Sequence, residues 1–329
     1  MEHQSNAPAQ RPLAAIDVGS NTIHLVAALP STNAQPDLTV LMDELEFVRL
    51  GAGVGKTGRI APERFEQGLK TLKHLRELAE QAQAQTILCA ATEVLRQAQN
   101  GEEFLARVRE EVGLKITVIS GDQEAAFTFW GATSGRKIAR EQPVAVGDLG
   151  GGSLELVFGT GQDLTWRKSL PIGSGALHDR FIQSDPPTSG ELHDLRQEVR
   201  AVLNAQTLAK QAQQAPLLIV CGGTATTLLY FVRRALGVSD GQNYLTLAEV
   251  EQALTRLCAL TAETVTQRYH IETPRARILG AGAAVLAALM ERLAAPTMEI
   301  SQRGIREGMI LAYSQHGARW LEAAEQGAL

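Results

Sequence analysis

Short runs of apolar residues alternate along the chain with longer segments in which apolar residues recur every three or four positions. The runs at residues 13–16, 143–146 and 217–220 are typical of buried strands, whereas the spacing within residues 62–82 is typical of an amphipathic helix. Strands that alternate with helices predict an α/β fold, in which functional residues gather at the ends of strands.

A turn with three consecutive glycines joins two of the predicted strands. Asp148 opens it, residues 150–152 are all glycine, and Glu155 closes it; we call residues 148–155 the triple-glycine turn. Successive glycines are costly unless the backbone must turn sharply or approach something closely, and their N–H groups can bind phosphate oxygens. Two carboxylates beside such a hollow favour a divalent cation, because bare carboxylates would repel an anionic ligand. The alternative interpretation is a tight hairpin with two ordinary solvated acids.

Similar turns occur elsewhere in the chain. The sequence Asp17-Val18-Gly19-Ser20-Asn21-Thr22, which we call the Asp17 turn, also lies between two predicted strands. Two related α/β lobes, each contributing an acidic turn to a shared cleft, would explain this arrangement. The cleft would hold a phosphate chain, with Asp17, Asp148 and Glu155 around a divalent cation. A third turn, Gly222-Gly223-Thr224, leads into a predicted helix, and the N–H groups of a helix N-terminus suit an anion.

Composition narrows the class of protein. With 329 residues, 44% of them hydrophobic, the chain is long enough for about two domains. The net charge of −5 gives no support to binding of DNA through a general positive field. The three cysteines are widely spaced and odd in number, which favours a reduced, cytoplasmic protein. No apolar stretch is long enough for a membrane span, so we expect no membrane partner.

These motifs resemble those of the Ppx/GppA family of exopolyphosphatases and guanosine pentaphosphate phosphatases. The Asp17 turn and the triple-glycine turn match the two phosphate motifs of that family, and further motifs match it in the same order. The similarity extends from about Leu13 to about Tyr313, which is nearly the whole chain. The further motifs are residues 49–51, 91–96, 119–125, 222–226, 281–286 and 303–308.

The resemblance implies an actin-like ATPase fold, in which two lobes of the ribonuclease-H type flank a cleft. It also implies an enzyme that hydrolyses the terminal phosphate of inorganic polyphosphate or of guanosine pentaphosphate, usually with Mg²⁺ or another divalent cation. We therefore expect lobe I over residues 13–139, with residues 305–329 packing back on it, and lobe II over residues 140–304. Residues 1–12 are expected to form a disordered lead-in.

Residue roles follow from the same resemblance. Glu124 matches the catalytic glutamate, which would orient or deprotonate the attacking water, and Arg96 matches an arginine that holds the phosphoryl group. Asp17, Asp148 and Glu155 are the expected metal ligands. Taken alone, Glu124 would be an ordinary acid at a helix start and Arg96 an ordinary surface residue. Contacts with phosphate are expected from Gly19, Ser20, Asn21, Gly150, Gly151, Gly152, Ser153, Gly223 and Thr224.

The chain departs from the family pattern at some positions. Leu154 stands where threonine is common, and residues 173–176 lack the usual Gly-x-x-Arg, so we expect one basic contact to be absent. Long members of the family continue into a C-terminal HD-type domain. This chain resembles the short form without that domain, which implies a preference for short polyphosphates or a nucleotide.

Other functions remain compatible with these turns. One is a phosphotransferase, because actin-like folds include sugar and acetate kinases, and another is an ATP-dependent binding or regulatory protein. The Ser120-Gly121-x-x-Glu124 motif favours hydrolysis over both. The sequence does not choose between polyphosphate and guanosine pentaphosphate, since both present a terminal phosphoanhydride. It also leaves open a homodimer, in which the apolar segment 283–293 would either form an interface or lie in the core.

Overall fold

The chain divides into two compact units, each of which is built from more than one segment of the sequence. Unit 1 contains the described part of residues 1–120 together with residues 306–323, and unit 2 contains the described part of residues 121–305 together with residues 324–327. Most of the predicted lead-in over residues 1–12 lies outside the described residues. The computed structural model describes residues 11–31, 36–161, 163–206, 217–327 and 329.

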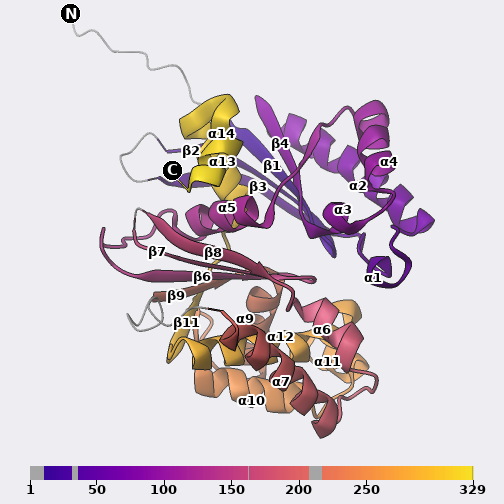
Figure 1. Ribbon diagram of the computed structural model, residues 1–329, viewed down its shortest axis with the longest axis vertical. Coiled ribbons are helices and arrows are strands. Elements are labelled where there is room, and N and C mark those ends of the chain that lie inside the picture. Colours follow the sequence, from indigo (N-terminus) through magenta and orange to yellow (C-terminus); the bar gives the residue numbers. More distant parts are fainter. Residues whose placement is uncertain (1–10, 32–35, 162, 207–216, 328) are drawn as a thin grey trace, which may run out of the picture. The chain divides into compact units, whose positions relative to one another are not determined.

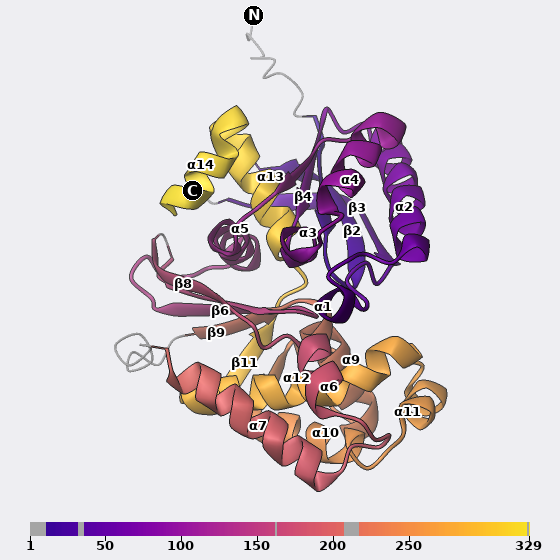
Figure 2. The same ribbon diagram turned by 45° about the vertical axis from the view of Figure 1, so that its right-hand side comes forward.

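Unit 1 is built on a mixed sheet with the strand order β3-β2-β1-β4-β5. The first three strands pair antiparallel, and β4 and β5 continue the sheet in parallel. Figures 1 and 2 show α2 on one face of this sheet and α13 on the other. The strands are β1 (Leu13–Val18), β2 (Thr22–Pro30), β3 (Leu38–Phe47), β4 (Thr86–Ala91) and β5 (Ile116–Val118). The helices are α1 (Val54–Thr57), α2 (Pro62–Gln81), α3 (Glu93–Gln97), α4 (Gly101–Arg107) with a π-helical turn (Val108–Val112), α13 (Ile305–His316), a 3₁₀ turn (Gly317–Arg319) and α14 (Trp320–Gln326).

Unit 2 is built on a second mixed sheet with the strand order β10-β11-β9-β6-β7-β8. Within this unit, α5 covers one face of the sheet and α9 and α12 lie on the other face (Figure 1). The strands are β6 (Val144–Leu149), β7 (Leu154–Gly159), β8 (Leu164–Leu170), β9 (Leu217–Cys221), β10 (Tyr244–Thr246) and β11 (Thr297–Ile300). The helices are α5 (Gly121–Thr133), α6 (Ser174–Phe181), α7 (Ser189–Asn204), α9 (Gly223–Leu236), α10 (Leu247–Leu257), α11 (Ala262–Tyr269) and α12 (Thr273–Arg292).

The two sheets share one connectivity. In each, three antiparallel strands are followed by parallel strands that add next to the first strand, as β4 adds to β1 and β9 adds to β6. The Asp17 turn joins β1 to β2, and the triple-glycine turn joins β6 to β7. The two acidic turns therefore occupy equivalent places in their units, and the α/β fold predicted from the alternation of patterns is confirmed.

The boundary between the units differs from the predicted one at residues 139 and 140. The contacts of α5 place it in unit 2, because its side chains pack on β6, β7 and β8. Its sequence is apolar nearly all round, with residues 123–132 buried. A helix of this kind needs a wide apolar surface, which the sheet of unit 2 provides.

Helix α12 runs through the core of unit 2. It begins at Thr273 and ends at Arg292, so it includes nearly all of the apolar segment 283–293 noted in the sequence. Residues 279–290 are buried, so the apolar segment 283–293 that was considered for a dimer interface packs almost entirely inside the unit. In the described part of the chain, no helix combines the length and the apolar character that crossing a membrane would require.

Helix α7 begins with a capping box that also fixes the segment before it. The Glu191 carboxylate accepts hydrogen bonds from the backbone N–H groups of Thr188 and Gln183, at 2.7 Å each, and from the hydroxyls of Thr188 and Ser184. The Ser184 hydroxyl bond, followed by the backbone bonds, lowers the pKa of Glu191 to about 2. Folding therefore favours the ionised form of the Glu191 carboxylate.

This pKa predicts a pH dependence of stability. Because the pKa of Glu191 is lower in the folded chain, its contribution to stability is present above its unfolded value and is lost as the pH falls towards about 2. We expect Glu191→Gln to flatten the fall in the free energy of unfolding over this acidic range. Urea denaturation at several pH values measures the slope of the free energy of unfolding against pH. The control is Glu263→Gln, on the exposed side of α11. An unchanged slope in Glu191→Gln would contradict the assignment.

Candidate active site

The triple-glycine turn places two carboxylates opposite each other at the end of a strand pair. Asp148 on β6 and Glu155 on β7 are direct register partners, so their side chains leave the same face of the sheet. The Gly150 N–H donates to the Ser153 carbonyl at 3.0 Å and closes the turn between them. The tight hairpin considered from the sequence is therefore present, and its acids differ in their surroundings.

Glu155 is held inside the sheet by two hydroxyls. Its side chain is only 2% exposed, and its Oε1 accepts hydrogen bonds of 2.7 Å from both Ser153 and Ser169. Ser169 lies on β8 as the register partner of Glu155. The Glu155 carboxylate therefore ties the triple-glycine turn to the neighbouring strand.

The glycine carbonyls of this turn face the start of α6. The carbonyls of residues 150–152 accept hydrogen bonds from the N–H groups of Ser174, Ala176 and Gly173, at 3.0, 2.8 and 3.1 Å respectively. In a planar trans peptide the C=O and the N–H point in opposite directions. The N–H groups of residues 151–153 must therefore point away from α6. A row of such N–H groups is suited to an anion.

Asp148 lies against the Gly222–Thr224 turn. Its register partner on β9 is Cys221, so this second turn leaves the sheet beside it. Gly222 has a φ of +91°, and a Cβ added there would lie 2.4 Å from Asp148 Oδ1. Only glycine allows both this backbone conformation and this approach. On the other side, the Thr128 hydroxyl donates to Asp148 Oδ2 at 3.4 Å.

The Gly222–Thr224 turn forms the N-terminus of α9 and is fixed from α12 and α6. Arg275 Nη1 donates to the Gly223 carbonyl at 2.6 Å, and the Thr224 and Ser174 hydroxyls are 3.2 Å apart. Gly282 of α12 packs against Thr224, where an added Cβ would meet a methyl carbon at 2.2 Å. Thus α6 and α12 hold both glycine turns of unit 2 in one arrangement.

Glu124 lies on the helix that contacts Asp148. It is in the first turns of α5, and its side chain is only 9% exposed. Thr128 follows it by four residues, so the two side chains share one face of the helix. Since Thr128 donates to Asp148, Glu124 lies one helical turn from that contact. Unit 2 therefore brings together the predicted Glu124, Asp148 and the two glycine turns.

Unit 1 contains the remaining predicted residues. The Asp17 turn is fixed by the loop after β3, because the Ser20 carbonyl accepts from Gly51 N at 2.8 Å and the Asn21 carbonyl accepts from Arg49 N at 2.8 Å. The Gly19 N–H donates to the Thr22 carbonyl at 3.0 Å and closes the turn. Both acidic turns are thus hairpins held by hydrogen bonds from outside the hairpin.

Asp17 and Arg96 lie at strand ends of unit 1. The register partner of Asp17 is His24, whose Nε2 is hydrogen-bonded to Asp43. Burial lowers the pKa of His24, and the bond with His24 lowers the pKa of Asp43. Arg96 is in α3, after β4, and its Nη1 donates to the Ile119 carbonyl at 2.5 Å. This hydrogen bond holds the Arg96 guanidinium against Ile119, the residue that follows β5.

The fit of these acids to a divalent cation differs from residue to residue. Among the described residues, no group of three His, Cys, Asp or Glu side chains comes together as a metal cluster. Mg²⁺ commonly uses only one or two carboxylates together with the phosphates of the substrate. Asp148 fits this pattern, because its partly exposed carboxylate lies beside the Gly222–Thr224 turn. Glu155 fits it less well, since two hydroxyls occupy its Oε1.

Comparison with known proteins identifies the family. The sequence profile of the Ppx/GppA phosphatase family matches residues 29–316. The chain belongs to this family. Exopolyphosphatase 2 of Mycobacterium tuberculosis is 30% identical over 313 residues, which cover 91% of this chain and 98% of that protein. Exopolyphosphatase 1 of Mycobacterium leprae is 28% identical over 308 residues, with coverage of 91% and 88%. The solved structure of a PPX-GPPA enzyme from Aquifex aeolicus matches with a TM-score of 0.75 at 29% identity, covering 92% of this chain and 99% of that one.

Membership of the Ppx/GppA family confirms the fold and the class of enzyme. The fold is the actin-like ATPase fold, and the chain is a hydrolase of phosphate compounds. The phosphotransferase and the binding protein that the sequence left open are not favoured. The roles of the individual residues stay predictions, as does the predicted cleft.

Some residues around the site were not found by sequence reasoning. Residues 173–176 stood out in the sequence only as a departure from the family pattern, but α6 begins at Ser174, and this segment supplies the hydrogen bonds to the triple-glycine turn. Thr128 carried a signal, because it follows Glu124 at helical spacing. Ser169 and Arg275 carried none, since their contacts depend on pairing between distant segments.

The hydroxyl pair on Glu155 gives a test of its positioning role. A hydrogen bond to a carboxylate contributes roughly 1.5–3 kcal/mol, so we expect Ser169→Ala to lower the free energy of unfolding by about 2 kcal/mol. In a Glu155→Gln background the same change should cost less, because the carboxylate is gone. Urea denaturation of the two single variants and the double variant measures this coupling. Strictly additive effects would contradict the described contact.

Proposed function

We propose that the chain is an exopolyphosphatase that releases the terminal phosphate from inorganic polyphosphate. The observation that carries this proposal is the orientation of the triple-glycine turn. Hydrogen bonds to α6 direct three N–H groups, those of residues 151–153, away from that helix. The turn that carries them begins at Asp148, which lies against Gly222 at the N-terminus of α9. Such a site suits a phosphate group that carries several negative charges. The names of the curated relatives agree with it.

In the proposed reaction, water attacks the terminal phosphorus and the bond to the bridging oxygen breaks. The Glu124 carboxylate aligns the water and accepts its proton, and the shortened polyphosphate leaves with the bridging oxygen. Arg96 and the backbone N–H groups at residues 20–21, 151–153 and 223–224 stabilise the negative charge of the phosphoryl group, whereas the N–H groups of Gly19 and Gly150 close their own hairpins.

A divalent cation is part of this proposal, with Mg²⁺ as the first choice. Asp148 is the residue of unit 2 that would hold it, with Asp17 of unit 1 as the second predicted ligand. A bound cation would neutralise charge on the phosphate oxygens of the substrate. We assign Glu155 to holding the turn that carries the N–H groups, because of its two serine contacts.

The test is a comparison of substrates. The protein is incubated with polyphosphate, guanosine pentaphosphate or ATP in the presence of Mg²⁺, and free phosphate is measured. We expect release from polyphosphate and loss of that release when a chelator removes the metal. Release from guanosine pentaphosphate alone would assign the second substrate named by the family resemblance. Transfer to an added acceptor, or ATP binding without turnover, would overturn the proposal of hydrolysis.

The cytoplasmic location and the homodimer stay predictions.

A further inference from the structure

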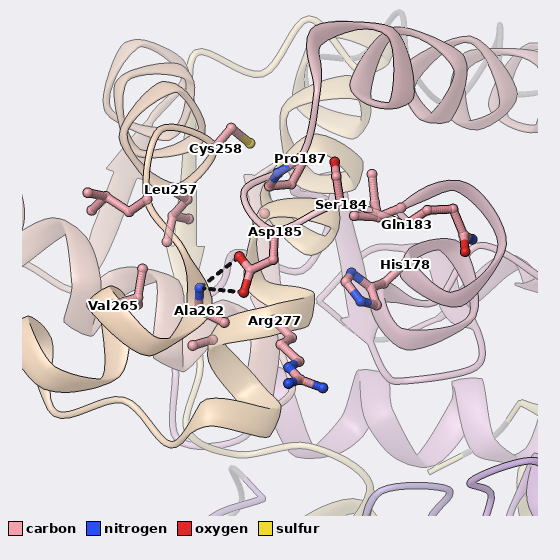
Figure 3. Close-up of a pocket in the computed structure, with 14 residues that line it drawn as sticks. His178, Gln183, Ser184, Asp185, Pro187, Leu257, Cys258, Ala262, Val265 and Arg277 are labelled. Atoms are coloured by element: carbon pink, nitrogen blue, oxygen red, sulfur yellow. Dashed lines mark hydrogen bonds between the residues drawn. The ribbon is translucent and has the colours of Figure 1, made fainter.

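Unit 2 contains a cavity of about 270 Å³ that the proposed reaction does not use (Figure 3). Its walls come from the end of α6 with the segment that follows it, the end of α10, and the first turns of α11 and α12. None of the described residues that line it belongs to the glycine turns. Ile182, Leu257 and Val265 form an apolar part, while Asp185, Arg277 and His178 are polar.

The polar residues present one charge of each sign. Asp185 is held in place, because both of its carboxylate oxygens accept from the Ala262 N–H, at 2.9 and 3.1 Å. Arg277 projects from α12, and in the described part of the chain no ion pair joins it to Asp185 or to another acid. Two opposite charges that are both exposed and not paired with each other are available to a ligand. A carboxylate is the natural partner of the guanidinium, and an ammonium group that of the aspartate.

His178 adds a third polar group on the same wall. Its Nδ1 is buried, and no described residue forms a hydrogen bond with it. Burial lowers the pKa of His178, so the ring is neutral near pH 7 and can accept one hydrogen bond. Buried polar atoms normally have a partner, and a bound ligand or water would supply one here.

We propose that this cavity binds a small zwitterion, namely a free α-amino acid with an apolar side chain. Its carboxylate pairs with Arg277 and its ammonium group with Asp185, while the side chain packs on Ile182, Leu257 and Val265. The cavity is near the lower end of the usual size range for ligand pockets, roughly 300–1,000 Å³, which suits a molecule of this size. The two opposite charges favour a zwitterion over a simple anion, which would be repelled by Asp185.

The experiment is calorimetric titration of the full chain with leucine and with phenylalanine. We expect saturable binding at one site, and at least about tenfold weaker binding of isocaproate, which lacks the ammonium group, and of isopentylamine, which lacks the carboxylate. Arg277→Gln and Asp185→Asn should each weaken binding of the amino acid by the same factor as removal of the matching charge from the ligand. Asparagine keeps an oxygen for the Ala262 N–H, so the start of α11 should stay intact, which circular dichroism checks.

The matched control is Arg268→Gln, because Arg268 is an exposed arginine of α11 that does not line the cavity. This variant should bind the amino acid as the natural chain does. The proposal of a zwitterionic ligand would be overturned if isocaproate bound as tightly as leucine. It would also be overturned if Asp185→Asn bound leucine as tightly as the natural chain does. Absence of saturable heat up to about 10 mM, beyond the millimolar range of weak specific binding, would overturn the site. The titration measures only the binding of the amino acid and not the release of phosphate. Its outcome therefore does not depend on whether the proposed hydrolysis occurs.

Discussion

Glu124→Gln is expected to lower the rate of phosphate release from polyphosphate by about 10³-fold, because general-base catalysis typically contributes 10²–10⁴-fold. Glutamine has nearly the same shape as glutamate and can still orient a water molecule, but it cannot accept a proton. The side chain is nearly buried, so the isosteric change leaves the packing of α5 intact. We therefore expect polyphosphate binding to be retained while turnover is lost. Single-turnover phosphate release and a separate binding titration measure the two quantities.

The control for this variant is Glu141→Gln, since Glu141 is an exposed acid in the segment that follows α5. It should release phosphate at the natural rate. Near-normal turnover by Glu124→Gln would contradict the role of Glu124. Loss of binding together with loss of turnover would instead assign Glu124 to holding the substrate.

Gly173→Ala is expected to displace the triple-glycine turn. Gly173 has φ −68° and ψ 154°, a conformation that alanine adopts readily, so the backbone angles themselves allow the change. The new Cβ, however, would lie 2.3 Å from the Gly152 carbonyl carbon and 2.4 Å from the Ser153 nitrogen. Those atoms are backbone and cannot rotate aside. We expect the free energy of unfolding to fall by about 3 kcal/mol, the upper end of typical overpacking costs. Phosphate release should fall about 10²-fold, because a shift of about 1 Å at a catalytic centre has that effect.

Gly190→Ala is the matched control for this variant. Gly190 is in the first turn of α7, and an added Cβ there meets nothing within 4 Å. Alanine is favoured over glycine in a helix by about 1 kcal/mol, so stability should be unchanged or slightly higher, with phosphate release unaffected. Urea denaturation and the phosphate assay compare the two variants. Natural stability and activity in Gly173→Ala would show that the contact between Gly173 and the turn is less close than described.

The sequence was sufficient for features that depend on local chemistry. The turn at residues 222–224 is visible because the backbone itself requires glycine at Gly222, whose φ is +91°. The alternation of apolar runs predicted the α/β class because strand burial follows directly from apolar side chains. The order of motifs along the chain led to the Ppx/GppA family, which the comparisons confirm.

Other features depend on contacts between distant segments, and the sequence could not predict them. The start of α6 at Ser174 follows a glycine and has no capping side chain, so nothing local marks it as a helix. Its first turn is stabilised by packing on the triple-glycine turn, about twenty residues away. In the same way, the two serines on Glu155 come together only when β7 pairs with β8. The place of α5 in unit 2 likewise follows from the sheet that it covers.

The hydrogen bonds between the triple-glycine turn and α6 also bear on the thermodynamics of anion binding. A free tripeptide of glycine would lose much conformational entropy if it had to align its N–H dipoles around a phosphate. Here the carbonyls on the opposite side of the same peptides are already fixed by residues 173–176. The entropy is therefore lost when the chain folds, before any phosphate arrives. In the proposed reaction, these dipoles would need little reorganisation as negative charge develops on the transferred group, which is the condition under which electrostatic stabilisation is most effective.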